Sequence, residues 1–119
     1  MDLAGDLPRI YANYQFVEVF LELITNAVKA METSAEKRLE ISSRRATGGW
    51  VEVMVRDTGF GIPLVDKDKV FDLFYTRSAG HQDFGLWFVK TFVLGIGGII
   101  DCESNDAGTT FVVKLPAPL

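Results

Sequence analysis

Cysteine is scarce in this chain, and basic residues are fewer than acidic ones. Each of these two features excludes a class of function. The single cysteine, Cys102, excludes a disulfide framework and a multi-cysteine metal site, and it fits a reducing compartment such as the cytoplasm. Twelve Lys and Arg residues against 16 Asp and Glu residues give a net charge of −4. This balance excludes a broad basic surface for nucleic acid. An anionic ligand would therefore need local help from a metal ion, a lysine or backbone N–H groups.

The chain also lacks a recognisable targeting or membrane segment. MDLAGDLPRI, residues 1–10, has no basic stretch followed by an apolar one, so we expect no signal peptide. The nearest approach to a membrane span, residues 84–100, contains Lys90 and three glycines near its end. A spanning helix needs about 20 predominantly apolar residues. We therefore expect a buried helix followed by a strand, and no direct membrane insertion.

The periodicity of apolar residues predicts one domain over residues 1–119, in the order helix, two strands, loop, helix, two strands. The expected elements are a helix over 13–33, a hairpin of strands 37–45 and 50–57, a short helical piece over 65–74, a helix from Gly85 to about Gly95, and strands over 98–104 and 109–116. The apolar face of the first helix is expected to consist of Val17, Phe20 with Leu21, Ile24, Val28 and Met31. This order favours a two-layer α/β sandwich, with helices packed on one face of a mixed, mostly antiparallel sheet.

The first helix carries three polar residues at helical spacing, Glu22, Asn26 and Lys29. One interpretation is a solvated helix face, which is the usual meaning of a polar stripe. Asn26 argues against it, because asparagine is a poor helix former among otherwise good ones. A carboxamide oxygen between a carboxylate and an ammonium group also suits a Mg²⁺–phosphate arrangement. Both interpretations stay open on the residues alone.

The loop DTGFGIP, residues 57–63, is a second candidate site. Period two in the preceding strand places Asp57 on the same apolar face as Val51, Val53 and Val55, where a carboxylate needs a hydrogen-bond donor. Asp57 could simply cap its own turn. Alternatively, the donor could belong to a ligand, such as an exocyclic amino group. Gly59 and Gly61 would then let the backbone approach a flat ring.

A polar loop with a glycine, SAGHQD at 78–83, comes shortly before the second helix. A helix N-terminus offers N–H groups and a positive dipole end to phosphate, although such loops also occur as plain connectors. The sequence contains no GxxxxGK[ST], which excludes a P-loop.

Five stretches in order, ELITNAVKAM, DTGFGIP, VFDLFYTR, FGLWFVK and AGTTFVVKLP, resemble the ATP-binding domain of sensor histidine kinases. That domain belongs to the GHKL superfamily, which includes DNA gyrase, and it has the Bergerat fold. The resemblance covers about residues 14–116. It implies that this chain is a cytoplasmic piece of a longer parent protein, and that the parent protein can be membrane-anchored.

The resemblance implies a role for each matching residue. Asn26 would bind Mg²⁺, Glu22 would act as the general base, and Lys29 would contact phosphate. Asp57 would accept a hydrogen bond from the adenine amino group. The other residues implied to contact ATP are Gly59, Gly61, Ile62, Phe74, Tyr75, Thr76, Arg77, Gly85, Leu86 and Thr109, with Phe71 beside Phe74 in an aromatic motif.

The implied function is transfer of the γ-phosphoryl group of ATP to a histidine on a separate dimerisation domain, from which it would pass to a response regulator. His81 lies in a polar loop, which favours an ordinary surface residue over a phosphoacceptor. Asp83 stands where the family has a glycine, and its charge would repel phosphate. Two alternatives therefore stay open: a degenerate nucleotide- or partner-binding module without kinase activity, and a serine kinase of the anti-sigma-factor type.

Overall fold

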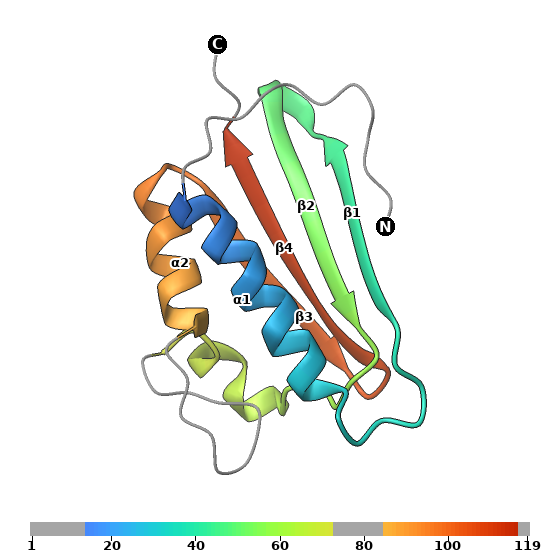
Figure 1. The fold of residues 1–119 in the computed structure, drawn as a ribbon. Helices are drawn as coiled ribbons and strands as arrows, with labels where there is room; N and C mark the ends of the chain where they lie inside the picture. Colours follow the sequence, from blue (N-terminus) through green and yellow to red (C-terminus); the bar gives the residue numbers. More distant parts are fainter. Residues whose placement is uncertain (1–13, 73–84, 117–119) are drawn as a thin grey trace.

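The computed structural model describes residues 14–72 and 85–116. Its elements are α1 (Tyr14–Ala30), β1 (Leu39–Arg45), the 3₁₀ turn η1 (Thr47–Gly49), β2 (Trp50–Asp57), the 3₁₀ helix η2 (Leu64–Lys69), α2 (Gly85–Gly95), β3 (Ile99–Asn105) and β4 (Gly108–Pro116). The expected order is confirmed, and both helices cover one face of the sheet (Figure 1). The short helical piece after the loop is a 3₁₀ helix and ends earlier than the sequence suggests.

The four strands are arranged in the order β1-β2-β4-β3, so the last strand of the chain lies beside the second. All pairings among these strands are antiparallel. The predicted burial on one face of β2 is confirmed for Val51, Val55 and Asp57, each 1% exposed, whereas Val53 is only partly buried. Because Asp57 is the last residue of β2, the strand places a buried carboxylate at one end of the sheet.

The core lies between the helix layer and the two central strands. Its side chains include Leu23 of α1, Val89 and Val93 of α2, and Phe111 and Val113 of β4, each at most 1% exposed. The segment after η2 is tied to this core, because the Phe71 ring meets that of Phe111 edge-on at a centroid distance of 6.0 Å. None of the helices within the described ranges is long and apolar enough to cross a membrane.

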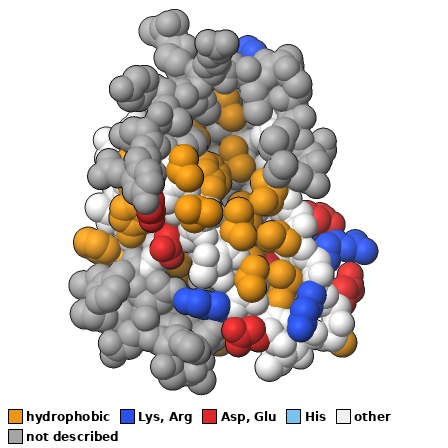
Figure 2. Space-filling model, in the orientation of Figure 1, with side chains coloured by type: hydrophobic (Ala, Val, Ile, Leu, Met, Phe, Trp, Pro, Cys, Tyr) orange, Lys and Arg blue, Asp and Glu red, His pale blue; other side chains and the backbone are white. Residues whose placement is uncertain are grey.

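Helix α1 buries a different face from the one expected. The buried side chains are Val19, Leu23, Asn26, Ala27, Ala30 and, just beyond the helix, Met31. Of the expected face, Met31 is buried and Phe20 packs partly buried against the core, as predicted. Ile24 is only partly buried, and Val17, Leu21 and Val28 are 52–53% exposed. Hydrophobic side chains are accordingly visible on the helix side of the molecule in Figure 2. The expectation failed because the apolar residues cover a wide arc of the helix, so periodicity did not select which part of that arc is buried. The structure buries the part that carries the small residues Ala27 and Ala30.

The outward face of the sheet carries a buried carboxylate of its own. Glu52 is 6% exposed, and Nη2 of Arg44 lies 3.1 and 3.3 Å from its two carboxylate oxygens. Arg44 and Lys114 are the register partners of Glu52 on the two neighbouring strands. The ion pair with Arg44 lets the strand bury an acidic residue away from the helices.

Candidate nucleotide site

The carboxylate of Asp57 closes the end of β2 and turns back onto the following loop. Its Oδ1 accepts a hydrogen bond of 2.9 Å from the backbone N–H of Gly59. The turn-capping interpretation of Asp57 is therefore confirmed. It does not compete with the ligand interpretation, because a carboxylate offers about four acceptor positions and one cap uses only one of them.

The loop after Asp57 is clamped against the C-terminal end of α1. Phe60 donates its N–H to the carbonyl of Ala30 at 3.2 Å, and the Thr58 hydroxyl lies 3.5 Å from the Met31 sulfur. A Cβ added to Gly59 would lie 2.5 Å from the Ala30 carbonyl oxygen. Gly59 is thus required by close contact with the helix backbone, whereas the sequence suggested contact with a ligand ring.

The other side of the same loop is clamped against the hairpin of β3 and β4. A Cβ on Gly61 would collide with the Asn105 carbonyl oxygen, so this glycine also serves chain packing. The N–H of Ile62 donates to Oγ of Ser104 at 2.7 Å. Ile62 itself is 8% exposed and packs in the core. The loop is therefore held between two elements that lie far from it in the sequence.

Thr109 lies directly across from Asp57, because the two residues are register partners in strands β4 and β2. The Thr109 side chain is 1% exposed, and its Oγ1 lies 2.9 Å from Oγ of Ser104. A buried carboxylate and a buried hydroxyl therefore stand side by side at one end of the sheet. This pair combines a strong hydrogen-bond acceptor with a group that can donate or accept.

The polar stripe of α1 runs along the border of the helix core. Asn26 is 8% exposed, whereas Glu22 and Lys29 are partly buried. Asn26 is therefore not on a solvated helix face. It belongs to the turn before the one whose Ala30 carbonyl contacts the Asp57 loop. The stripe and the loop thus approach each other at the same end of the helix.

Helix α2 begins at this end of the molecule too. Its first two residues, Gly85 and Leu86, are both buried, and Leu86 is 5% exposed. The remaining predicted nucleotide contacts, Phe74, Tyr75, Thr76 and Arg77, lie outside the described residues, as do His81 and Asp83. Within the described ranges no group of three or more His, Cys, Asp and Glu side chains forms a metal site.

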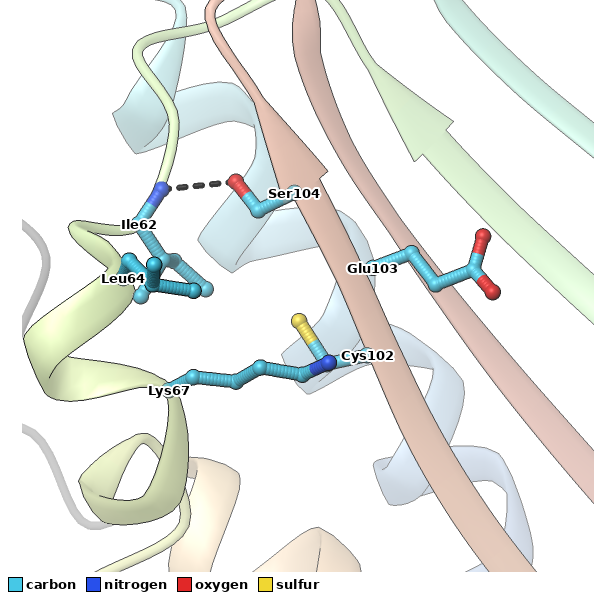
Figure 3. Close-up of a pocket in the computed structure, with 6 residues that line it drawn as sticks. All are labelled: Ile62, Leu64, Lys67, Cys102, Glu103 and Ser104. Atoms are coloured by element: carbon cyan, nitrogen blue, oxygen red, sulfur yellow. Dashed lines mark hydrogen bonds between the residues drawn. The ribbon is translucent and has the colours of Figure 1, made fainter.

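A cavity of about 310 Å³ borders this region on the side of β3. Ile62, Leu64 and Lys67 line it from the loop and η2, and Cys102, Glu103 and Ser104 line it from the strand (Figure 3). It contains neither Asp57 nor Thr109, so it is not the space between the predicted base-binding residues. It meets that region at the hydrogen bond between Ile62 and Ser104.

Sequence reasoning missed Ser104 as a member of the site. The available signal was its place in β3, where Ile100 and Cys102 alternate toward the helices and the next inward position is a serine. A hydroxyl on a buried strand face needs partners, and here they are the loop and β4.

Comparison with known proteins identifies the family. The family described as "Histidine kinase-, DNA gyrase B-, and HSP90-like ATPase" matches residues 13–119. The sensory histidine kinase/phosphatase NtrB of Rhizobium meliloti (strain 1021) is 34% identical over 125 residues, covering 93% of this chain but only 33% of NtrB.

Two solved structures extend the likeness. The catalytic domain of the histidine kinase ThkA superposes with a TM-score of 0.80 at 27% identity, covering 98% of this chain and 78% of that one. Full-length ShkA in complex with AMPPNP gives a TM-score of 0.82 at 26% identity, covering 98% of this chain and 24% of ShkA. The chain therefore belongs to the histidine kinase-, DNA gyrase B- and HSP90-like ATPase family.

Proposed function

We propose that this chain is the ATP-binding catalytic domain of a two-component sensor histidine kinase. It would bind Mg²⁺-ATP and transfer the γ-phosphoryl group to a histidine on a separate dimerisation domain, for onward transfer to a response regulator. Its relatives named as sensor kinases and the AMPPNP complex of ShkA support this proposal. The chain would then form one domain, residues 1–119, of a longer protein and would act in the cytoplasm.

The observation that carries the proposal is the buried Asp57 beside Thr109. Asp57 is 1% exposed and lies at the end of β2, and Thr109 is its register partner on β4. Adenine presents an exocyclic amino donor next to a ring nitrogen acceptor. A carboxylate acceptor beside a hydroxyl complements that pair of groups, whereas guanine would turn its O6 acceptor toward the carboxylate. The pair therefore favours adenine.

The stripe on α1 would serve the phosphate end. The Asn26 carboxamide oxygen is a ligand atom of the type that Mg²⁺ prefers. Asn26 would hold a magnesium ion that takes its other ligands from water and phosphate oxygens. When bound, the ion would neutralise phosphate charge. Glu22 would orient the acceptor, and Lys29 would pair with a phosphate oxygen.

The N-terminus of α2 supplies the second group of phosphate contacts. The backbone N–H groups at Gly85 and Leu86 belong to the first turn of an 11-residue helix, whose dipole favours anions. Phe74, Tyr75, Thr76 and Arg77 would complete the pocket from the segment between η2 and α2. Catalysis would then consist mainly of positioning and charge neutralisation, as in other phosphoryl transfers.

Calorimetric titration of the chain with ATP and ADP in the presence of Mg²⁺ tests the binding part of the proposal. We expect Asp57→Asn to weaken both nucleotides by at least about tenfold, because it removes a charge-assisted hydrogen bond. Asparagine still offers an oxygen to the Gly59 N–H, so the turn should persist. Asn26→Ala should weaken ATP mainly when Mg²⁺ is present. Asp101→Asn, an exposed position on β3, is the matched control and should change nothing.

No binding of either nucleotide at millimolar concentration would contradict the proposal. The transfer step needs the full-length parent protein and ATP labelled on the γ-phosphate. Label that is lost in acid but kept in base indicates phosphohistidine, as proposed. Acid-stable label would indicate the serine kinase alternative, and binding without any label would indicate the degenerate module, which the charge of Asp83 favours.

A further inference from the structure

Ser104 connects the two halves of the predicted base-binding region. Its Oγ accepts the N–H of Ile62 at 2.7 Å, 42 residues away in the sequence (Figure 3). The same oxygen lies 2.9 Å from Oγ1 of Thr109 and 3.4 Å from the carbonyl oxygen of Gly108. One hydroxyl therefore touches the loop that follows Asp57 and the start of the strand opposite Asp57.

The hydrogen-bonding capacity of a serine explains why this connection is specific. A hydroxyl has one proton and two acceptor lone pairs. The Ile62 N–H occupies one lone pair, which leaves the proton and the other lone pair for Thr109 and Gly108. If Thr109 donates to Ser104, this bond directs the Thr109 proton and leaves the Ser104 proton for the Gly108 carbonyl; if Ser104 donates, the Thr109 oxygen accepts. In both arrangements Ser104 holds the Ile62 N–H and the Thr109 oxygen at a fixed separation.

The loop has little room to move independently of Ser104. A Cβ on Gly61 would lie 3.0 Å from the Ser104 oxygen, so the backbone passes close to this side chain. The N–H of Ile62 belongs to a residue that is 8% exposed, and a buried N–H without a partner is costly. Loss of the serine hydroxyl should therefore shift the loop rather than leave it in place.

We propose that Ser104 is a positioning residue for nucleobase binding, acting through Ile62 and Thr109 without touching the nucleotide. The proposal rests on the function proposed above. The sequence motifs place the site on the loop, the helices and β4. Ser104 adds strand β3 to it. Ser104 fixes the distance between the Asp57 loop and Thr109, and hence the fit to the edge of the base.

The cavity beside Ser104 determines which substitution is informative. Ser104 lines a space of about 310 Å³, so a water molecule could replace the hydroxyl in a Ser104→Ala variant. Ser104→Val and Ser104→Thr are a better pair. Valine and threonine have nearly the same shape and both suit a strand, but only threonine keeps a hydroxyl. The difference between the two variants isolates that hydroxyl.

The test is calorimetric titration of the folded chain and both variants with adenosine and with ADP. We expect Ser104→Thr to stay within about threefold of the unaltered chain and Ser104→Val to bind both ligands roughly tenfold more weakly, since it loses about two hydrogen bonds. The two ligands should weaken by the same factor, because the change lies at the base end of the site. The preference for ATP over GTP should also fall in Ser104→Val only.

A purely structural role gives a different result. Ser104→Val would then lower the urea midpoint of unfolding but bind adenosine as Ser104→Thr does, and the positioning role would be refuted. A larger loss for ADP than for adenosine would refute it too. If the unaltered chain binds neither ligand, the proposed function fails and this inference fails with it; if the chain binds and the two variants are equal, only this inference fails.

Discussion

Replacing Gly59 with alanine should destabilise the chain before any ligand is considered. The added Cβ would lie 2.5 Å from the carbonyl oxygen of Ala30, 2.6 Å from its carbonyl carbon and 2.8 Å from its Cβ. Ordinary contact begins at 3.4 Å, so the loop and the end of α1 would have to separate by about 0.9 Å. Two of these three atoms are backbone, so no side-chain rotation can relieve the contact.

The cost follows from the two interactions that the separation would disturb. Overpacking of this kind typically costs about 1–3 kcal/mol. The hydrogen bond of 3.2 Å from Phe60 to Ala30 would lengthen beyond a useful distance, which adds about 0.5–1.5 kcal/mol. We therefore expect the free energy of unfolding to fall by roughly 2–4 kcal/mol, or the melting temperature by about 8–16 °C.

Urea unfolding followed by circular dichroism measures this change as a lower midpoint with an unchanged slope. Gly95→Ala is the matched control, because no atom lies within 4 Å of the added Cβ and alanine is the better helix former. Equal midpoints for the two variants would refute the packing argument. Unchanged stability together with lost adenosine binding would show instead that Gly59 is needed for contact with the base.

Two further comparisons test other parts of the reasoning. Leu23→Ala should lower the free energy of unfolding by about 2–5 kcal/mol, because Leu23 is fully buried. Leu21→Ala, at a 53% exposed position, should change it by less than about 1 kcal/mol, and similar urea midpoints for the two variants would contradict the assignment of the buried face of α1. Asp83→Gly should tighten ATP more than adenosine, because the resemblance implies that its negative charge faces the phosphates; an equal calorimetric response of both ligands would refute the repulsion.

The sequence predicted the elements well but misjudged how α1 packs. Strand alternation placed Asp57 on the buried face, and the structure confirms it at 1% exposure. Helical periodicity failed in α1 because Val17, Leu21 and Val28 widen its apolar arc beyond the part that is buried. The part that is buried contains Ala30, whose backbone lies close to Gly59. Such contacts between distant segments cannot be derived from the pattern of one helix.

The structure gives the two glycines of the predicted site a different reason from the one that the sequence suggested. A D-T-G-x-G stretch suggests room for a ligand, but both glycines contact the backbone of other segments, Gly59 at Ala30 and Gly61 at Asn105. Ser104 went unnoticed because a lone serine near the end of a strand has many ordinary explanations. Its role can be inferred only from the contacts of its hydroxyl with Ile62 and Thr109 in the folded chain.

Among the described residues, the region predicted to bind the base is held by contacts between the Asp57 loop, α1 and the strands. The loop is hydrogen-bonded to α1 through Phe60 and Ala30, and to β3 through Ile62 and Ser104. Strand β2 pairs with β4 from Trp50 to Asp57. A region built on a sheet and a packed helix needs little rearrangement to bind, so less binding free energy is lost in ordering it. Recognition of the base and grip on the phosphates would then be separable, since the first rests on the scaffold and the second on residues such as Arg77. This separation would let a departure such as Asp83 weaken phosphate binding while leaving adenine recognition intact.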